Sequence, residues 1–424
     1  MSDVVILGAG LGGTLMAYEM LDQLRPADRL TLIGQEPRYH FVPSNPWVAV
    51  GWRKRADIEI DLSDVMRRRG VNYITQGARR VDPRSRRVEL NDGTHVNYDY
   101  LVIATGPELA FDEIEGLGPK AHTQSICHVD HAAQAYDAFE EFCKHPGPVV
   151  IGAAQGASCF GPAYEFAFIL DTELRKRRIR NKVKMTFVTP EPYIGHLGLD
   201  GVGDTKSVME SEFRNRHIQW ITNATVKKVT DNSMSVEEMN EDGSPRKMHE
   251  LSFAYSMILP SFRGVTALRG IEGLVNPRGF VLIDEHQQNP GYPEIFAVGV
   301  CVAIPPVGPT PVPVGTPKTG FMIESMVTAT AVNIGKLLRG KDATARATWN
   351  AICLADFGDS GVAFVAQPQI PPRNVNWSAK GAWVHVAKIA FEKYFLRKMN
   401  GGKGDNFFEN FVLRRLNIHK LDES

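Results

Sequence analysis

The 424-residue sequence has no long uninterrupted apolar run. Without a window of about 18 consecutive apolar residues, a membrane-spanning helix is excluded, whereas an amphipathic anchor is not. The first residues also lack the basic and apolar segments of a secretory signal, so we expect no signal peptide. Basic and acidic residues balance, with 48 Lys or Arg against 48 Asp or Glu, and this gives no indication of nucleic-acid binding.

Cysteine is also scarce. The five cysteines are Cys127, Cys143, Cys159, Cys301 and Cys353. Their number is odd, they lie far apart, and none belongs to a C-x-x-C pair or a Cys/His cluster. This pattern excludes a disulfide-stapled secreted scaffold and a zinc site of ordinary spacing, so we expect no metal site. We therefore expect the functional cysteines, if any, to act in redox chemistry.

The clearest motif lies at the N-terminus. An apolar run at residues 4–7 leads into glycines at Gly8, Gly10 and Gly13, then into an apolar helix pattern and a second β-rich run at 30–33. A strand, a G-x-G-x-x-G turn and a helix in this order predict a dinucleotide site, with the pyrophosphate at the helix N-terminus. The ribose partner expected near the end of the second strand is Glu36, two residues later than usual.

A second copy of this unit follows the first. Residues 148–157 repeat the pattern, but Ala154 stands where the first unit has Gly10. A side chain there crowds the backbone that a pyrophosphate must approach, so the second unit is predicted to have lost its nucleotide.

These units predict an α/β fold of two tandem Rossmann-like domains followed by a C-terminal amphipathic helical membrane anchor. The first domain comprises residues 1–110 and 275–340, because β-rich runs near 280 and 295 return to it. Residues 111–274 form the second domain, and residues 341–424 hold the last cysteine and the anchor. Lys318, Thr319 and Gly320 open an apolar helix whose N-terminus can stabilise negative charge.

The anchor is predicted from the tail. Residues 373–420 hold ten Lys or Arg against three acids, together with eight aromatic residues. On a helical wheel, an apolar stripe that includes Trp383, Phe391 and Phe395 has Lys388, Glu392 and Lys393 at its flank. This pattern is typical of an interfacial helix on an anionic membrane surface. The alternative is that the helices pack on the body or on another subunit.

Two cysteines have informative surroundings. Cys159 lies just before Pro162, which suits the start of a helix, and a thiolate at a helix N-terminus is stabilised by the dipole. Cys353 lies shortly before the basic tail. The alternative for each is a small buried apolar residue.

The residues together resemble the sulfide:quinone oxidoreductase family of the flavoprotein disulfide reductase superfamily. The resemblance covers essentially the whole chain. Its motifs are Gly8-Ala9-Gly10, residues 41–47, Ala104-Thr105-Gly106, Gln124-Ser125-Ile126-Cys127, residues 156–165, Pro192-Tyr193-Ile194-Gly195-His196, Pro317-Lys318-Thr319-Gly320 and the Cys353 segment with its tail.

The resemblance implies a membrane-associated FAD enzyme that oxidises hydrogen sulfide to polysulfide or sulfur and reduces a membrane quinone. It implies that Cys159 and Cys353 are joined by a disulfide or sulfur bridge beside the flavin, that Cys127 helps to deliver or release sulfur, and that Glu165, His131 and His196 handle protons. It also implies a peripheral location on the cell membrane and a homo-oligomer.

The resemblance implies two further sets of residues. The expected FAD contacts are Gly8, Gly10, Gly13, Glu36, Ala78, Thr105, Gly106, Gly299, Lys318, Thr319 and Gly320. The expected quinone contacts are Pro43, Asn350, Leu354, Phe391 and Phe408.

Some positions depart from the family pattern. Gly299 is followed by Val300 instead of an aspartate, Phe408 replaces an expected tyrosine, and Cys301 is unexpected. Two related alternatives are a type II NADH:quinone oxidoreductase, which needs an intact nicotinamide loop, and a flavocytochrome c sulfide dehydrogenase, which is exported. A third is a flavin-fold module without redox activity.

Overall fold

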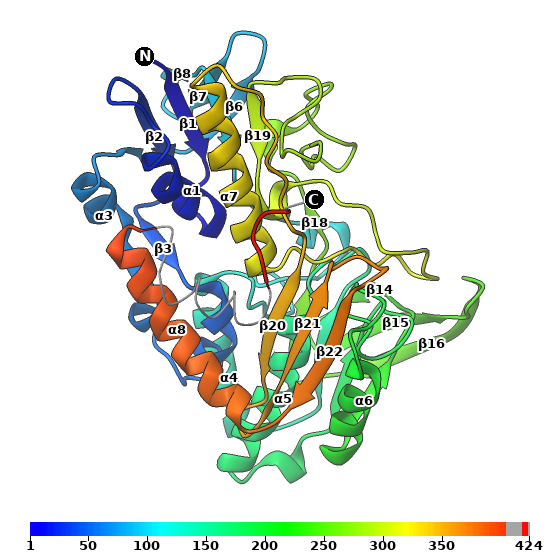
Figure 1. Cartoon of the computed structure of the whole chain (residues 1–424). Helices are drawn as coiled ribbons and strands as arrows, with labels where there is room; N and C mark the ends of the chain where they lie inside the picture. The colour runs from blue at the N-terminus through cyan, green and yellow to red at the C-terminus, as the bar shows by residue number, and fades with distance from the viewer. Residues whose placement is uncertain (404–417, 423–424) are drawn as a thin grey trace.

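The computed structural model describes residues 1–403 and 418–422. The strands of the described residues form seven sheets. Three of these organise the fold, and helices pack between and around them (Figure 1). No helix of the described residues is long and apolar enough to cross a membrane.

The first sheet is parallel and has the strand order β19-β9-β1-β2-β5. Its strands are β1 (Asp3–Leu7), β2 (Arg29–Ile33), β5 (Asn72–Ile74), β9 (Tyr100–Ile103) and β19 (Ile295–Ala297). The apolar run of β1 is continuous because both faces of this sheet are covered. Strand β19 joins from almost 200 residues further along the chain, so this unit is discontinuous.

Helices cover one face of this sheet and a small sheet covers the other. Helices α1 (Leu11–Leu21) and α7 (Gly320–Leu337) lie side by side over Val4 and Ile6. Val5 and Leu7 point to the opposite face. The small antiparallel sheet there consists of β6 (Ala78–Asp82), β7 (Arg87–Leu90) and β8 (His95–Asn97).

The second sheet repeats the pattern with the parallel order β13-β12-β11-β17. Its strands are β11 (Val149–Ala153), β12 (Met185–Val188), β13 (Ile218–Ile221) and β17 (Tyr255–Leu259). One face packs on α4 (Val129–Lys144) and α5 (Gly161–Lys176), and the other on β14 (Ala224–Val229), β15 (Ser233–Met239) and β16 (Pro245–Ser252). The remaining elements of this region are α6 (Thr205–Asn215), β10 (Glu108–Leu109) and β18 (Phe262–Arg263).

The third sheet was not foreseen from the sequence. It is antiparallel and consists of β20 (Ala351–Asp356), β21 (Gly361–Gln367) and β22 (Val375–Lys380). Helix α8 (Trp383–Gly401) follows it and runs past β20, β21 and the short elements of the first domain (Figure 1). Those short elements are β3 (Arg38–His40), α2 (Asn45–Val48), β4 (Glu59–Asp61) and α3 (Leu62–Arg68).

Helix α8 is arranged differently from the wheel prediction. Lys388 and Glu392, expected at the flank, are buried against the body at 3% and 4% exposure, because both are ion-paired there. The outer face instead carries Trp383 at 51%, Val386 at 65% and Phe391 at 40% exposure. The predicted stripe is therefore divided, with Phe395 buried and Trp383 outside.

Candidate functional site

The N-terminal glycine turn has the shape that a dinucleotide requires. Gly8 has φ +110°, and a Cβ there would lie 2.3 Å from the carbonyl oxygen of Ala104. A Cβ at Gly13 would lie 1.7 Å from the carbonyl oxygen of Gly8. Gly8 therefore lets the turn lie against the end of β9, and Gly13 lets helix α1 pack closely on the turn. A Cβ at Gly10 would meet no protein atom within 4 Å. The space beside Gly10, at the N-terminus of α1, fits a pyrophosphate.

Other predicted FAD contacts surround similar open space. Gly106 has φ +66°, and Gly320 is the first residue of α7; a Cβ at either would meet nothing within 4 Å. The side chain of Thr319 donates to the carbonyl oxygen of Asn350 (3.3 Å) and does not cap α7. The first amides of α7 are thus left for a ligand, and the helix dipole favours negative charge there. These residues fit FAD.

Lys318 precedes this helix start. Burial lowers the pKa of Lys318 to about 8, although nearby Cys301 and Cys159 oppose that effect. Its Nζ lies 5.0 Å from the ring centre of Phe280. The lysine is therefore a partly desolvated donor near Cys159, and not a solvent-exposed surface residue.

The remaining predicted FAD contacts differ in their surroundings. Gly299 has φ +83°, and its amide donates to the sulfur of Met326 (3.4 Å). Ala78 begins β6 and is half-buried. Oε1 of Glu36 lies 3.0 Å from Nε2 of His40, so this oxygen already has a partner within the protein.

The three predicted cysteines come from different elements, and Cys159 lies close enough to the other two for their charges to influence one another. Cys159 lies between β11 and α5, Cys353 in β20, and Cys127 just before α4. The pKa of Cys159 responds to the charges of Cys127, Lys318 and Glu165, and the pKa of Cys353 responds to those of Cys159 and Glu165. All three thiols are half-buried and free.

Burial dominates the acidity of these thiols. It raises the pKa of Cys159 and of Cys353 to about 12, and that of Cys127 to about 11. We had expected a helix N-terminus to stabilise the thiolate of Cys159. Helix α5 begins two residues later, at Gly161, and desolvation by burial outweighs the opposing charge of Lys318. These thiols are therefore neutral until a base or a substrate removes the proton.

A buried ion pair lies beside the cysteines. Nζ of Lys388 on α8 binds Oε1 of Glu165 on α5, and the two residues are 3% and 6% exposed. Burial raises the pKa of Glu165 to about 7, while Lys388 lowers it. Nζ of Lys388 also lies 5.4 Å from the ring centre of Trp47. A carboxyl group with a pKa near 7 can accept and release protons at physiological pH.

Lys388 is the residue that the sequence analysis did not assign to the site. The helical wheel placed it at the flank of the apolar stripe. The only hint was indirect, since a glutamate inside an apolar helix such as α5 needs a cationic partner, but its identity follows only from the fold.

The two predicted histidines lie less directly beside the thiols. Burial lowers the pKa of His196, and its Nδ1 accepts a hydrogen bond from the amide of Gly198 (3.2 Å). Burial and the neighbouring His128 lower the pKa of His131, whose ring lies 5.9 Å from that of His128. Neither histidine is among the charges that shift the pKa of Cys159 or Cys353.

The second glycine loop is covered by another part of the chain. The amide of Gly156 donates to the carbonyl oxygen of Pro313 (2.7 Å), and the carbonyl oxygen of Ala157 accepts from the amide of Gly315 (2.8 Å). The acid after β12, Glu191, is fully buried and accepts from Tyr164 (2.8 Å). The groups that would hold a second nucleotide are therefore occupied within the protein.

The predicted quinone contacts lie around α8 and its neighbours. Phe391 contacts Phe41 and Phe395, with ring centres 5.8 Å and 5.3 Å apart. Pro43 is exposed in the turn after Phe41, and Asn350 and Leu354 lie at the start of and within β20. Phe408 lies outside the described residues.

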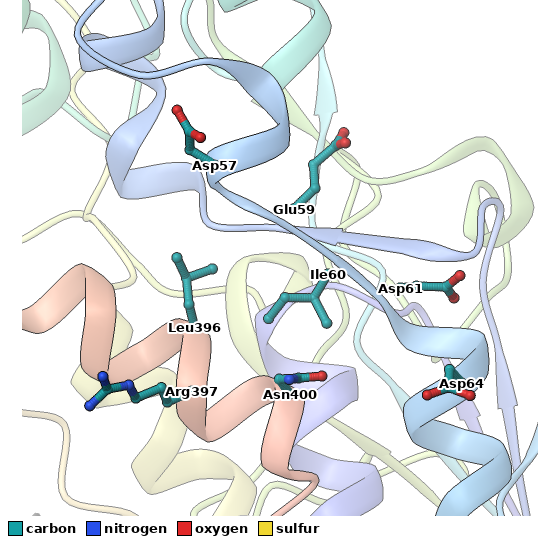
Figure 2. A pocket seen from close by; sticks show the side chains of 8 residues that line it. All are labelled: Asp57, Glu59, Ile60, Asp61, Asp64, Leu396, Arg397 and Asn400. Atoms are coloured by element: carbon teal, nitrogen blue, oxygen red, sulfur yellow. The ribbon is translucent and has the colours of Figure 1, made fainter.

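The pocket in Figure 2 lies elsewhere. It is a hollow of about 450 Å³ between the β4–α3 segment and α8. Its lining residues are Asp57, Glu59, Ile60, Asp61, Asp64, Leu396, Arg397 and Asn400, none of which is a predicted site residue. Asp57 and Asp61 accept hydrogen bonds from nearby backbone amides, so the acids of this hollow have structural roles.

Known proteins resemble this chain in sequence. Residues 2–330 match the model of the pyridine nucleotide-disulphide oxidoreductase family. The chain is 42% identical to the sulfide-quinone reductase of Aquifex aeolicus (strain VF5), over 99% of this chain and 96% of that protein. It is 23% identical to the mitochondrial sulfide:quinone oxidoreductase of Mus musculus, over 72% and 66% of the two chains.

Solved structures show the same similarity to sulfide:quinone oxidoreductases. The crystal structure of the Aquifex aeolicus sulfide:quinone oxidoreductase superposes with a TM-score of 0.95 and 41% identity, over 100% of this chain and 98% of that one. NDH2 from Plasmodium falciparum superposes with a TM-score of 0.70 at 15% identity, over 98% of both chains, which shows a shared fold alone. The chain therefore belongs to the sulfide:quinone oxidoreductase family, within the pyridine nucleotide-disulphide oxidoreductases.

Proposed function

We propose that this flavoprotein oxidises hydrogen sulfide to polysulfide or sulfur and reduces a quinone. The observation that carries the proposal is the proximity of Cys159 and Cys353 to each other and to Glu165, whose partner is Lys388. Cys127 lies near Cys159, as does Lys318, which precedes the expected FAD-binding helix start. Hydrosulfide loses one proton and two electrons to reach the oxidation level of sulfur, and the quinone takes up two electrons and two protons. FAD, when bound, supplies the two-electron carrier between the two substrates.

The protein residues have separate tasks in this proposal. The Gly8–Gly13 turn, Thr105, Gly106 and the start of α7 hold FAD. Cys159 and Cys353 carry the sulfur, and Cys127 delivers or releases it. Glu165 takes the proton from the sulfur substrate or from a thiol, because its pKa near 7 matches the working pH. Lys388 keeps part of the Glu165 population ionised. His131 and His196 relay protons further from the thiols.

Entry of electrons from NADH is the main alternative. The second glycine loop argues against it, because Pro313 and Gly315 occupy the backbone groups that would bind a pyridine nucleotide.

The domain boundaries form part of the same proposal. Residues 1–110 with 275–340 are the FAD domain, and residues 111–274 are a second domain with a degenerate nucleotide site. Residues 341–424 are the region of Cys353, the quinone site and the anchor.

Replacement of one cysteine tests the reaction. We expect Cys353→Ala to retain FAD, because Cys353 is not a predicted FAD contact. Its sulfide-dependent quinone reduction should fall by at least about 100-fold, because one sulfur-carrying thiol is lost. The measurements are the flavin absorbance of the purified protein and anaerobic turnover with sulfide and a soluble quinone.

The matched control is Cys143→Ala, since Cys143 lies on α4 next to Arg177, apart from this cluster. Its turnover should equal that of the parent protein. Turnover of Cys353→Ala at the parent rate would contradict the cysteine mechanism.

The Glu165–Lys388 pair predicts a pH dependence. If ionised Glu165 is the base, turnover rises with pH through a midpoint near 7. Lys388→Met removes the charge that lowers the pKa of Glu165, so this midpoint should shift upward by about 1 unit or more. Lys388→Arg keeps the charge and should stay near the parent midpoint. The exposed Lys393→Met on the same helix is the control for a general effect of lost charge, and an equal shift in that variant would contradict the assignment.

The outer face of α8 supports a peripheral membrane location. Trp383, Val386 and Phe391 point outward while the charged residues Lys388 and Glu392 are buried, and Val42 beside the helix is 52% exposed. Such an exposed apolar surface is typical of membrane contact, and the basic tail adds attraction to anionic lipid. The quinone would then enter from the membrane near Phe391. The resemblance also supports assembly into a homo-oligomer.

Liposome flotation tests this surface. The double substitution Trp383→Asp and Val386→Asp should release most of the protein from anionic liposomes, because two charges then face the lipid. Met248→Asp is the control, since Met248 is 53% exposed on β16, in a different region. Equal flotation of the double variant and the control would show that the outer face of α8 is not the anchor.

A further inference from the structure

A cluster of three metal-ligating side chains lies outside the proposed sulfur site. Glu36 follows β2, His40 lies in β3, and His128 caps α4. One ligand atom from each lies within 4.8 Å of the other two. We propose that Glu36, His40 and His128 bind a divalent transition-metal ion of the zinc class.

The distances suit such an ion. Oε1 of Glu36 lies 3.0 Å from Nε2 of His40 and 3.9 Å from Nε2 of His128. Two atoms bound tetrahedrally to zinc at its usual bond lengths lie about 3.3 Å apart, so small side-chain rotations would bring all three into the coordination shell. Two imidazole nitrogens and one carboxylate oxygen are donors that zinc prefers, whereas magnesium and calcium prefer oxygen alone. A fourth position would remain for water.

The other ring nitrogen of each histidine faces a carboxylate. Nδ1 of His40 lies 3.1 Å from Oε1 of Glu59, within ion-pair distance though not aligned for a hydrogen bond. Nδ1 of His128 lies 3.4 Å from Oδ2 of Asp130. Metal-binding histidines usually donate their second N–H to a carboxylate, which fixes the ring and strengthens the ligand.

Arg55 organises these supporting carboxylates. Its guanidinium binds both Glu59 and Asp130. In Figure 2, Ile60 points toward α8 while the carboxylate of Glu59 points the opposite way. Glu59 also lines the hollow beside α8, but its carboxylate faces the histidine cluster.

The tautomer of His128 changes when the ion binds. In the structure, Nδ1 accepts from the amide of Asp130 (3.3 Å), so neutral His128 carries its proton on Nε2. Coordination through Nε2 requires that proton to leave and Nδ1 to be protonated, and the nearby carboxylate of Asp130 can then accept from Nδ1. The exchange keeps the ring neutral.

The site would connect two parts of the chain. It links the segment after β2 to the start of α4, and His128 directly follows Cys127. A bound ion would therefore hold the segment that carries Cys127. The inference does not depend on the proposed reaction, since metal binding can be measured without sulfide or quinone.

Zinc titration of the full-length, tag-free flavoprotein tests the proposal. After treatment with a chelator, the parent protein should bind one Zn²⁺ by isothermal titration calorimetry at a site that His40→Gln and His128→Asn each weaken by at least about tenfold. His128→Asn retains an acceptor that can cap α4, so it tests the site even if His40→Gln fails to fold. Zn²⁺ should also raise the melting temperature of the parent but of neither variant.

His249→Asn is the matched control, because Nε2 of His249 contacts one carboxylate, that of Glu238 (2.8 Å), outside this cluster. It should bind Zn²⁺ as the parent does. If zinc bound to the cysteine thiols instead, its affinity would be the same in the parent and in every histidine variant, and the expected weakening would not be observed. Absence of a Zn²⁺ site in the parent, or an unchanged site in His128→Asn, would overturn the proposal.

Discussion

The ion pair between Lys388 and Glu165 connects the two halves of the proposed chemistry. Transfer of both charges from water to the protein interior is unfavourable in free energy, and loss of either partner would leave an uncompensated charge there. The pair forms because α8 and α5 both pack on β20, beside Cys159 and Cys353. The helix whose outer face carries Trp383 and Phe391 thus also supplies the charge that lowers the pKa of Glu165 against the effect of burial. Helix α8 therefore carries both the apolar surface suited to lipid and a residue of the proposed sulfur site.

The two Rossmann units show how one local pattern gives two outcomes. In the first, Gly10 and Gly320 leave space beside two helix N-termini, and this space fits FAD. In the second, the proline-rich loop hydrogen-bonds to Gly156 and Ala157, and Glu191 is held by Tyr164. The difference lies less in the loop sequence than in the distant segment that covers it.

Much of the fold could be predicted from local sequence, because apolar runs and glycine turns report nearby structure. The Rossmann units, the FAD fold family and helix α8 were anticipated in this way. The β20–β22 sheet was not, since antiparallel pairing between weakly patterned segments depends on tertiary contacts. The buried position of Lys388 was also missed, because a helical wheel cannot show which face meets a distant glutamate. The acidity of Cys159 was misjudged, because the local sequence does not show that burial outweighs the nearby positive charge of Lys318.

The central claim is that electrons enter this flavoprotein from sulfur held at Cys159 and Cys353, and not from a pyridine nucleotide. Anaerobic absorbance of the purified holoenzyme, with hydrosulfide or NADH added to separate samples, tests it most directly. The account predicts rapid loss of the oxidised flavin band with hydrosulfide and none with NADH. Rapid bleaching by NADH with no response to hydrosulfide would contradict it.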